Sequence, residues 1–114
     1  MVKVKSSVKK SVLKTIKFLQ KQIIITEVIL FGSYAAGTPH KYSDIDIAVI
    51  SPDFENKDLS FKADIFSRAK ISCSIDVDIH PFTVKSLKNA RPTNFMGHIL
   101  KTGTVVSKDG VFLL

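Results

Sequence analysis

The sequence predicts an α/β fold, because segments with a helical spacing of apolar residues alternate with short β-branched runs that are typical of strands. Three observations carry this prediction. An amphipathic segment opens the chain, an apolar run rich in isoleucine follows it, and a later segment alternates apolar and polar residues. The chain has 114 residues, of which 45% are hydrophobic, enough for one core. We therefore expect a single domain over residues 1–114.

The opening segment predicts a helix with one stripe facing the core. Its apolar residues recur at intervals of three or four, while lysines fill most of the other positions. Ser6 or Ser7 is the expected N-cap, because a serine hydroxyl can accept a hydrogen bond from the first turn. The residues of the predicted apolar stripe are Val8, Val12, Ile16, Leu19 and Ile23.

Two strands are predicted on either side of a polar loop, the first over Ile24 to Phe31 and the second over Ser43 to Ile50. Gly32 allows the chain to turn tightly after the first strand. A short helix can begin at Tyr34, so that its free N–H groups point at an anion.

The second strand divides its residues between two faces, since side chains alternate along a strand. Asp44, Asp46 and Ala48 share one face, and the apolar residues Ile45, Ile47 and Val49 share the core face. Two ionised carboxylates side by side repel each other unless solvent or a cation separates them. The pair is therefore either a cation site or part of an exposed, solvated strand face.

A helix and a third strand are predicted next. Asp58 is expected to cap a helix that extends to about Lys70, with Leu59, Ala63, Phe66 and Ala69 as its inward stripe. The segment from Ile71 to Ile79 then alternates apolar and polar residues, which predicts a strand that Pro81 closes. Its polar face carries Asp76, Asp78 and His80.

The acidic residues of these two strands suggest a shared metal site. If the strands are neighbours in one sheet, Asp44, Asp46 and either Asp76 or Asp78 converge on one or two ions. Ligation by oxygen atoms alone suits Mg²⁺ or Mn²⁺ together with substrate phosphates. His80 is either a contact to a phosphate or acceptor, or simply an exposed side chain at the end of a strand.

The C-terminal part predicts short elements. Thr83 can cap a helix through Leu87, and Asn94 can cap a second helix that ends at Gly103. A terminal hairpin is predicted from Val105-Val106 and Val111 to Leu114, with Asp109-Gly110 as its turn.

Charge and composition limit the function classes. The net charge is +7, and seven lysines precede the first acidic residue, Glu27. Such a basic helix attracts nucleic acid, nucleotide phosphates or an acidic partner, or is only a solvated face. No apolar run approaches the roughly 20 residues of a membrane-spanning helix, and the lone Cys73 has no partner for an internal disulfide. We expect a soluble protein of the cytoplasm that does not bind membranes.

The ordered set of motifs resembles a known family. Gly32-Ser33, then ten residues, then Asp44-Ile45-Asp46 is similar to the signature of the polymerase-β-like nucleotidyltransferase superfamily, and the small size resembles its minimal branch. Gly37, Ser43 and the segments DIHPFT and NFMGHILKTGTVV also match. The resemblance implies a polymerase-β palm-like fold, a small mixed β-sheet with helices packed mainly on one face.

The resemblance also implies roles for individual residues. Gly32 and Ser33 would hold the terminal phosphates of a nucleoside triphosphate, with ATP expected, and Ser43 and Lys41 would add further nucleotide contacts. Asp44 and Asp46 would bind two Mg²⁺ ions, for which Mn²⁺ can substitute. Asp78, with Asp76 as the alternative, would be the third carboxylate and would help to activate the attacking hydroxyl.

Small proteins of this branch are often paired with a HEPN-type toxin, to which the nucleotidyltransferase attaches a nucleotide on a tyrosine. The resemblance therefore implies transfer of AMP to a tyrosine of a HEPN-type partner protein. Three alternatives remain open: transfer to a small molecule such as an aminoglycoside, neutralisation of a partner by binding alone, and binding or end-modification of RNA through the lysine-rich helix.

Overall fold

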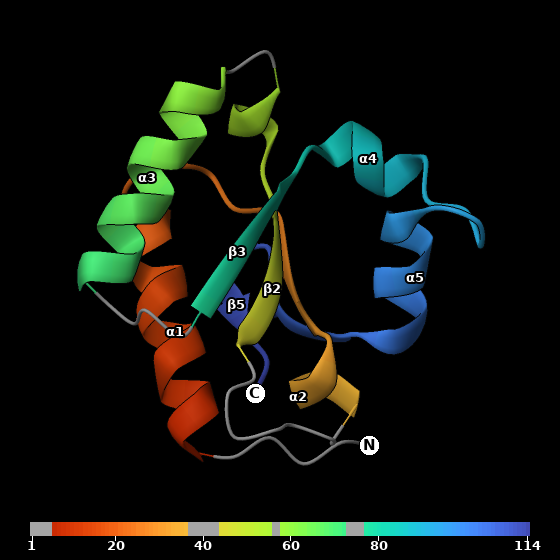
Figure 1. The fold of residues 1–114 in the computed structure, drawn as a ribbon, viewed down its shortest axis with the longest axis horizontal. Helices are drawn as coiled ribbons and strands as arrows, with labels where there is room; N and C mark the ends of the chain where they lie inside the picture. Colours follow the sequence, from red (N-terminus) through yellow and green to blue (C-terminus); the bar gives the residue numbers. More distant parts are fainter. Residues whose placement is uncertain (1–5, 37–43, 56–57, 73–76) are drawn as a thin grey trace.

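A computed structural model of the protein shows a five-stranded mixed β-sheet with helices on both faces (Figure 1). The structure describes residues 6–36, 44–55, 58–72 and 77–114. The strands lie in the order β3-β2-β1-β4-β5, and all neighbours are antiparallel except β2 and β3, which are parallel. This architecture confirms the predicted fold class. The strands are β1 Glu27–Phe31, β2 Ile45–Ile50, β3 Val77–Phe82, β4 Thr104–Lys108 and β5 Val111–Phe112.

Two long helices cover one face of the sheet, and two of the short helices, α4 and α5, cover part of the other, whereas the short helix α2 contributes Ala35 to the core on the first face (Figure 1). The long helices are α1 Ser6–Gln20 and α3 Leu59–Ser72. The short ones are α2 Ser33–Ala36, α4 Val84–Lys88 and α5 Phe95–Thr102, and a 3₁₀ turn, η1, spans Pro52–Phe54. Within the described ranges, no helix is long and apolar enough to cross a membrane.

The larger core lies between the sheet and helices α1 and α3. All five residues of the predicted apolar stripe of the first helix are buried in it, although Ile23 lies beyond the end of α1. Helix α1 starts at Ser6 itself. On the sheet side, the core consists of the inward residues Val28, Leu30, Ile45, Ile47, Val49, Val77, Ile79 and Val106.

A second, smaller core occupies the opposite face, beneath α5. It contains Ile29, Phe31, Ala48, Ile50, Met96 and Ile99. Ala48 lies on the same face of β2 as Asp46, as predicted, but it is fully buried in this core. Helix α5 covers the later residues of β2 on this face, and Asp46, near the start of the strand, is half-buried.

Helix α3 is the crossover that parallel pairing of β2 and β3 requires. It continues through Ser72, so the prediction of a strand from Ile71 is wrong: Ile71 lies in the helix and is 84% exposed. The six residues of β2 extend about 20 Å, and 14 helical residues return the chain over about 21 Å. The required length, rather than the local alternation, explains where the helix ends.

Two further boundaries differ from the predictions. Of the predicted inward stripe of α3, Ala69 is buried and Phe66 packs against the core beside Phe54, whereas Ala63 is exposed and Ile65 is buried instead. The side chain of Leu59 lies outside the description. The first strand starts at Glu27 rather than at Ile24, which is 65% exposed. The Ile24 backbone N–H donates to the Asp53 carboxylate at 2.7 Å, so this residue is held outside the sheet.

Three of the predicted helix caps and the terminal hairpin are confirmed, whereas the predicted cap at Ser6 or Ser7 is wrong, because both residues lie within α1. The side chains of Asp58, Thr83 and Asn94 each accept a hydrogen bond from the first turn of the helix that follows. Asp109 and Gly110 both have positive φ, 51° and 86°. This is the backbone of a type I′ turn, which matches the twist of a two-residue hairpin.

We expect Leu19→Ala to lower the free energy of unfolding by about 2–5 kcal/mol, because Leu19 is fully buried in the larger core and its truncation leaves a cavity. Leu113→Ala is the matched control: Leu113 is 53% exposed, and we expect a loss below about 1 kcal/mol. Denaturant titrations followed by circular dichroism measure both values. Equal losses would contradict the described packing of α1.

Candidate functional site

Three neighbouring strands bring Phe31, Asp46 and Asp78 into one row across the sheet. Phe31 of β1 pairs with Asp46 of β2, and Asp46 pairs with Asp78 of β3. Residues paired in register point to the same face, and neighbouring strands are about 4.8 Å apart. The parallel pairing therefore places two carboxylates side by side, as the sequence predicted for neighbouring strands.

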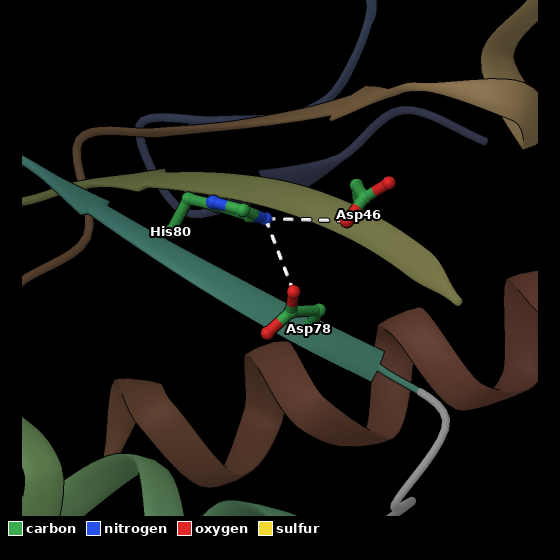
Figure 2. Close-up of side chains that lie close together, drawn as sticks. All are labelled: Asp46, Asp78 and His80. Atoms are coloured by element: carbon green, nitrogen blue, oxygen red, sulfur yellow. Dashed lines mark hydrogen bonds and ion pairs between the residues drawn. The ribbon is translucent and has the colours of Figure 1, made fainter. Parts of the chain in front are cut away.

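The imidazole of His80 lies between these carboxylates (Figure 2). Its Nε2 atom is 3.2 Å from Asp46 Oδ1 and 3.4 Å from Asp78 Oδ2. The side chains are only partly buried, with exposed fractions of 31% for His80, 27% for Asp46 and 44% for Asp78. A proton on Nε2 can be donated to either carboxylate, which reduces the repulsion between them.

The same three side chains form a group able to hold a divalent cation. One ligand atom from each of Asp46, Asp78 and His80 lies within 4.8 Å of the other two. Two carboxylate oxygens and one imidazole nitrogen are common metal donors, and the site is open enough for water or substrate to complete the coordination. The donor set therefore fits a divalent metal.

The turn at Gly32 lies directly against Asp46. Gly32 has φ of +78°, and a Cβ added there would be 2.6 Å from Asp46 Oδ2. Two features of this position therefore favour glycine: the backbone is in the left-handed region, and the Asp46 carboxylate approaches it closely. The backbone that leads into α2 is in this way placed beside the acidic pair.

An aromatic cluster adjoins His80 and restricts its ring. The ring centroid of His80 is 4.9 Å from that of Phe31 and 6.4 Å from that of Phe95, both in edge-on geometry. Phe95 also packs against Phe31 and Phe82, at 5.7 Å and 5.9 Å. A cavity of about 380 Å³ between α4 and α5 is lined in part by Phe82 and Phe95.

One cation lies near the acidic pair. Lys70, in the last turn of α3, has its Nζ atom 3.9 Å from Asp78 Oδ1. Both side chains are more than 40% exposed, so solvent screens this pair and its contribution to stability is small. Lys70 leaves Asp78 accessible to another cation.

The structure joins some of the predicted site residues and does not describe others. Asp46, Asp78 and Gly32 lie together, while Asp44 is exposed just before β2 and is not a member of the group with His80. Ser33 is the first residue of α2, and its side chain lies outside the description. Further predicted residues outside the described ranges are Lys41, Ser43 and Asp76.

His80 is the member of this group that the sequence analysis did not count among the candidate metal ligands. Its alternation with Asp76 and Asp78 already indicated the shared face, but a lone histidine at the end of a strand gave no sign of its distance from Asp46. That distance depends on the pairing of β3 with β2.

Comparison with known proteins identifies the family. Residues 9–100 match the family model for the nucleotidyltransferase domain. The chain belongs to the nucleotidyltransferase domain family. A stretch of 41 residues is 54% identical to the protein adenylyltransferase MntA of Shewanella oneidensis, and it covers 35% of this chain and 30% of that protein. The aligned stretch thus spans less than a third of this relative.

Solved structures share the nucleotidyltransferase fold. A crystal structure of a toxin–antitoxin with AMP-PNP superposes with a TM-score of 0.62 at 28% identity, over 84% of this chain and 72% of that one. A putative nucleotidyltransferase from Sulfolobus solfataricus superposes with a TM-score of 0.59 at 21% identity. The superposition covers 100% of this chain and 99% of the Sulfolobus chain. At that identity, the second likeness shows the fold alone.

We expect Gly32→Ala in this nucleotidyltransferase domain to lower the free energy of unfolding by roughly 1–2 kcal/mol and to weaken Mn²⁺ binding at least about tenfold. Alanine at this position must adopt the positive φ of the native backbone, which is unfavourable for a residue with a Cβ, and the Cβ displaces the Asp46 carboxylate. Denaturant unfolding and isothermal titration calorimetry with Mn²⁺ measure the two effects.

Gly110→Ala is the matched control for this substitution. Gly110 has φ of +86°, but a Cβ there meets no atom within 4 Å. The control should lose similar stability and keep its Mn²⁺ affinity. Equal losses of affinity in both variants would show that the contact between Gly32 and Asp46 is unimportant for binding.

Proposed function

We propose that this protein transfers AMP from ATP to a tyrosine hydroxyl of a HEPN-type partner toxin and releases pyrophosphate. The observation that carries the proposal is the pairing of Asp46 with Asp78 beside the Gly32 turn, because a phosphate-holding turn next to paired carboxylates is what nucleotidyl transfer needs. The relative named protein adenylyltransferase MntA and the similar toxin–antitoxin with AMP-PNP support AMP and a toxin as the reaction partners.

In this proposal the nucleotide is held by the segment between β1 and β2. The backbone of Gly32 and the hydroxyl of Ser33 bind the terminal phosphates, and Ser43 and Lys41 add contacts to the triphosphate. The position of Gly32 supports this arrangement, since the turn lies directly against the Asp46 carboxylate. The whole chain, residues 1–114, acts as one minimal nucleotidyltransferase domain in the cytoplasm, where ATP is available.

The carboxylates Asp44, Asp46 and Asp78 are the proposed metal ligands. When bound there, two Mg²⁺ ions, or Mn²⁺ in their place, neutralise the attacking and leaving oxygens of an in-line displacement at the α-phosphorus. Asp44 lies just before β2, two residues ahead of Asp46, which keeps its carboxylate near the start of the strand. Asp78 is preferred to Asp76 as the third acid, because its partner in the strand register is Asp46.

The proposed reaction requires one bond to form and one to break. The tyrosine oxygen forms a bond to the α-phosphorus, and the bond between the α-phosphorus and the bridging oxygen breaks to release pyrophosphate. Asp78 orients the hydroxyl and accepts its proton, which passes to solvent. The carboxylates and the Gly32 turn position the reactants and lower the charge repulsion between them.

We expect Asp46→Asn and Asp78→Asn each to reduce AMP transfer at least about a hundredfold, because each removes a charge that faces the reacting phosphate. Transfer is measured as incorporation of α-³²P-labelled ATP into a HEPN-type partner in the presence of Mg²⁺. Asp64→Asn is the control: Asp64 pairs with Arg68 on the exposed face of α3, 2.8 Å away, and should retain wild-type activity.

The same assay separates catalysis from simple binding. If the toxin is neutralised equally by the wild type and by Asp46→Asn, and no label is transferred, then the protein is a binding antitoxin and the proposed enzyme activity is wrong. Loss of transfer in Asp76→Asn, with Asp78→Asn active, would assign the third acid to Asp76.

A further inference from the structure

We infer that His80 is a nitrogen ligand of the metal site, and that it makes one metal position favour a first-row transition ion such as Mn²⁺ over Mg²⁺. The inference rests on the proposed function for the presence of a metal site, and it adds a ligand and a metal preference to that site. The ligands of this position are Asp46 Oδ1, Asp78 Oδ2 and His80 Nε2.

The two distances from His80 Nε2 to the carboxylate oxygens match the edges of a coordination polyhedron. Two ligands each about 2.1 Å from one ion lie about 3.0 Å apart at octahedral angles and about 3.4 Å apart at tetrahedral angles. His80 Nε2 is 3.2 Å from Asp46 Oδ1 and 3.4 Å from Asp78 Oδ2. The side chains thus need little movement to share an ion.

The orientation of the imidazole is fixed by its neighbours. The edge-on contacts with Phe31 and Phe95 hold one side of the ring, and Nε2 points between the carboxylates (Figure 2). His80 also lies two residues after Asp78 on the same strand face and beside Ala48 in the register. The small side chain of Ala48 leaves room for the ring to reach towards Asp46.

The chemistry of imidazole determines the expected preference. Mg²⁺ is a hard cation that favours oxygen ligands and retains its water, whereas imidazole nitrogen suits first-row transition ions better. A position with one nitrogen and two oxygens should therefore bind Mn²⁺ more tightly than Mg²⁺. The second proposed metal position, beside Asp44, has carboxylate ligands alone. It should keep the preference of oxygen ligands for hard ions such as Mg²⁺.

Electron spin-echo envelope modulation of the full-length protein with one equivalent of Mn²⁺, without nucleotide or partner, tests the inference. We expect the wild type to show modulation from a directly coordinated ¹⁴N nucleus. The modulation should disappear in His80→Asn and persist in His98→Asn, because His98 is exposed on α5 and outside the site. Circular dichroism checks that both variants are folded.

Calorimetric competition between Mg²⁺ and Mn²⁺ provides a second measurement. The preference for Mn²⁺ over Mg²⁺ should fall at least about tenfold in His80→Asn. His80→Asp, which replaces the nitrogen by oxygen, should recover Mg²⁺ binding without any ¹⁴N modulation. If His80→Asn binds all metals too weakly to measure, His80→Asp still tests the inference, because it keeps a metal ligand at this position.

Several results would overturn the inference. The first is Mn²⁺ binding by the wild type without directly coordinated nitrogen. The others are ¹⁴N modulation that survives in His80→Asn, and losses of Mg²⁺ and Mn²⁺ affinity in His80→Asn that are equal in size. The first result would mean that His80 only donates a hydrogen bond to the carboxylates. Because nucleotide and partner are absent, these outcomes are independent of whether the protein transfers AMP.

Discussion

The site depends on the in-register parallel pairing of β2 with β3. This pairing sets Asp46 opposite Asp78 and Ala48 opposite His80, so that three polar side chains meet on one face of the sheet. A slip of one residue would turn Asp78 and His80 towards the core beneath α1 and α3, where an unpaired charge is costly. The apolar residues Val77 and Ile79, both buried in that core, oppose such a slip and thereby hold the site in place.

Packing also determines where the site is open. Helix α5 covers one face over Ile29, Ala48 and Ile50, and this cover excludes water from the second core. Asp46 and Asp78 are the second residues of their strands and remain partly exposed. Phe31 and Phe95 lie between the two regions, because they contact each other and Phe31 also contacts His80. The fold thus places charged groups where the apolar cover ends.

The acidic pair explains why this arrangement suits phosphate chemistry. Two neighbouring carboxylates repel each other, and a proton donor or a cation between them relieves that repulsion. His80 lies within hydrogen-bonding distance of both carboxylates in the structure, and a divalent metal would take this part in the proposed reaction. The Gly32 turn lies directly against the Asp46 carboxylate, as the proposed binding of one nucleotide by both requires. Both the stability of the strand pair and the proposed catalysis therefore depend on a group that reduces the repulsion between these carboxylates.

Local patterns were sufficient to predict the amphipathic first helix, the Gly32 turn, the caps at Asp58, Thr83 and Asn94 and the terminal hairpin, because periodicity and capping act over a few residues. They also assigned Asp46 and Asp78 to one site, since alternation and the family resemblance both pointed to it. Alternation misplaced the start of β3, because the length of β2 requires α3 to continue through Ser72. The burial of Ala48 and the approach of His80 to Asp46 arise only when distant segments pack together, since each depends on a partner at least 30 residues away in the chain.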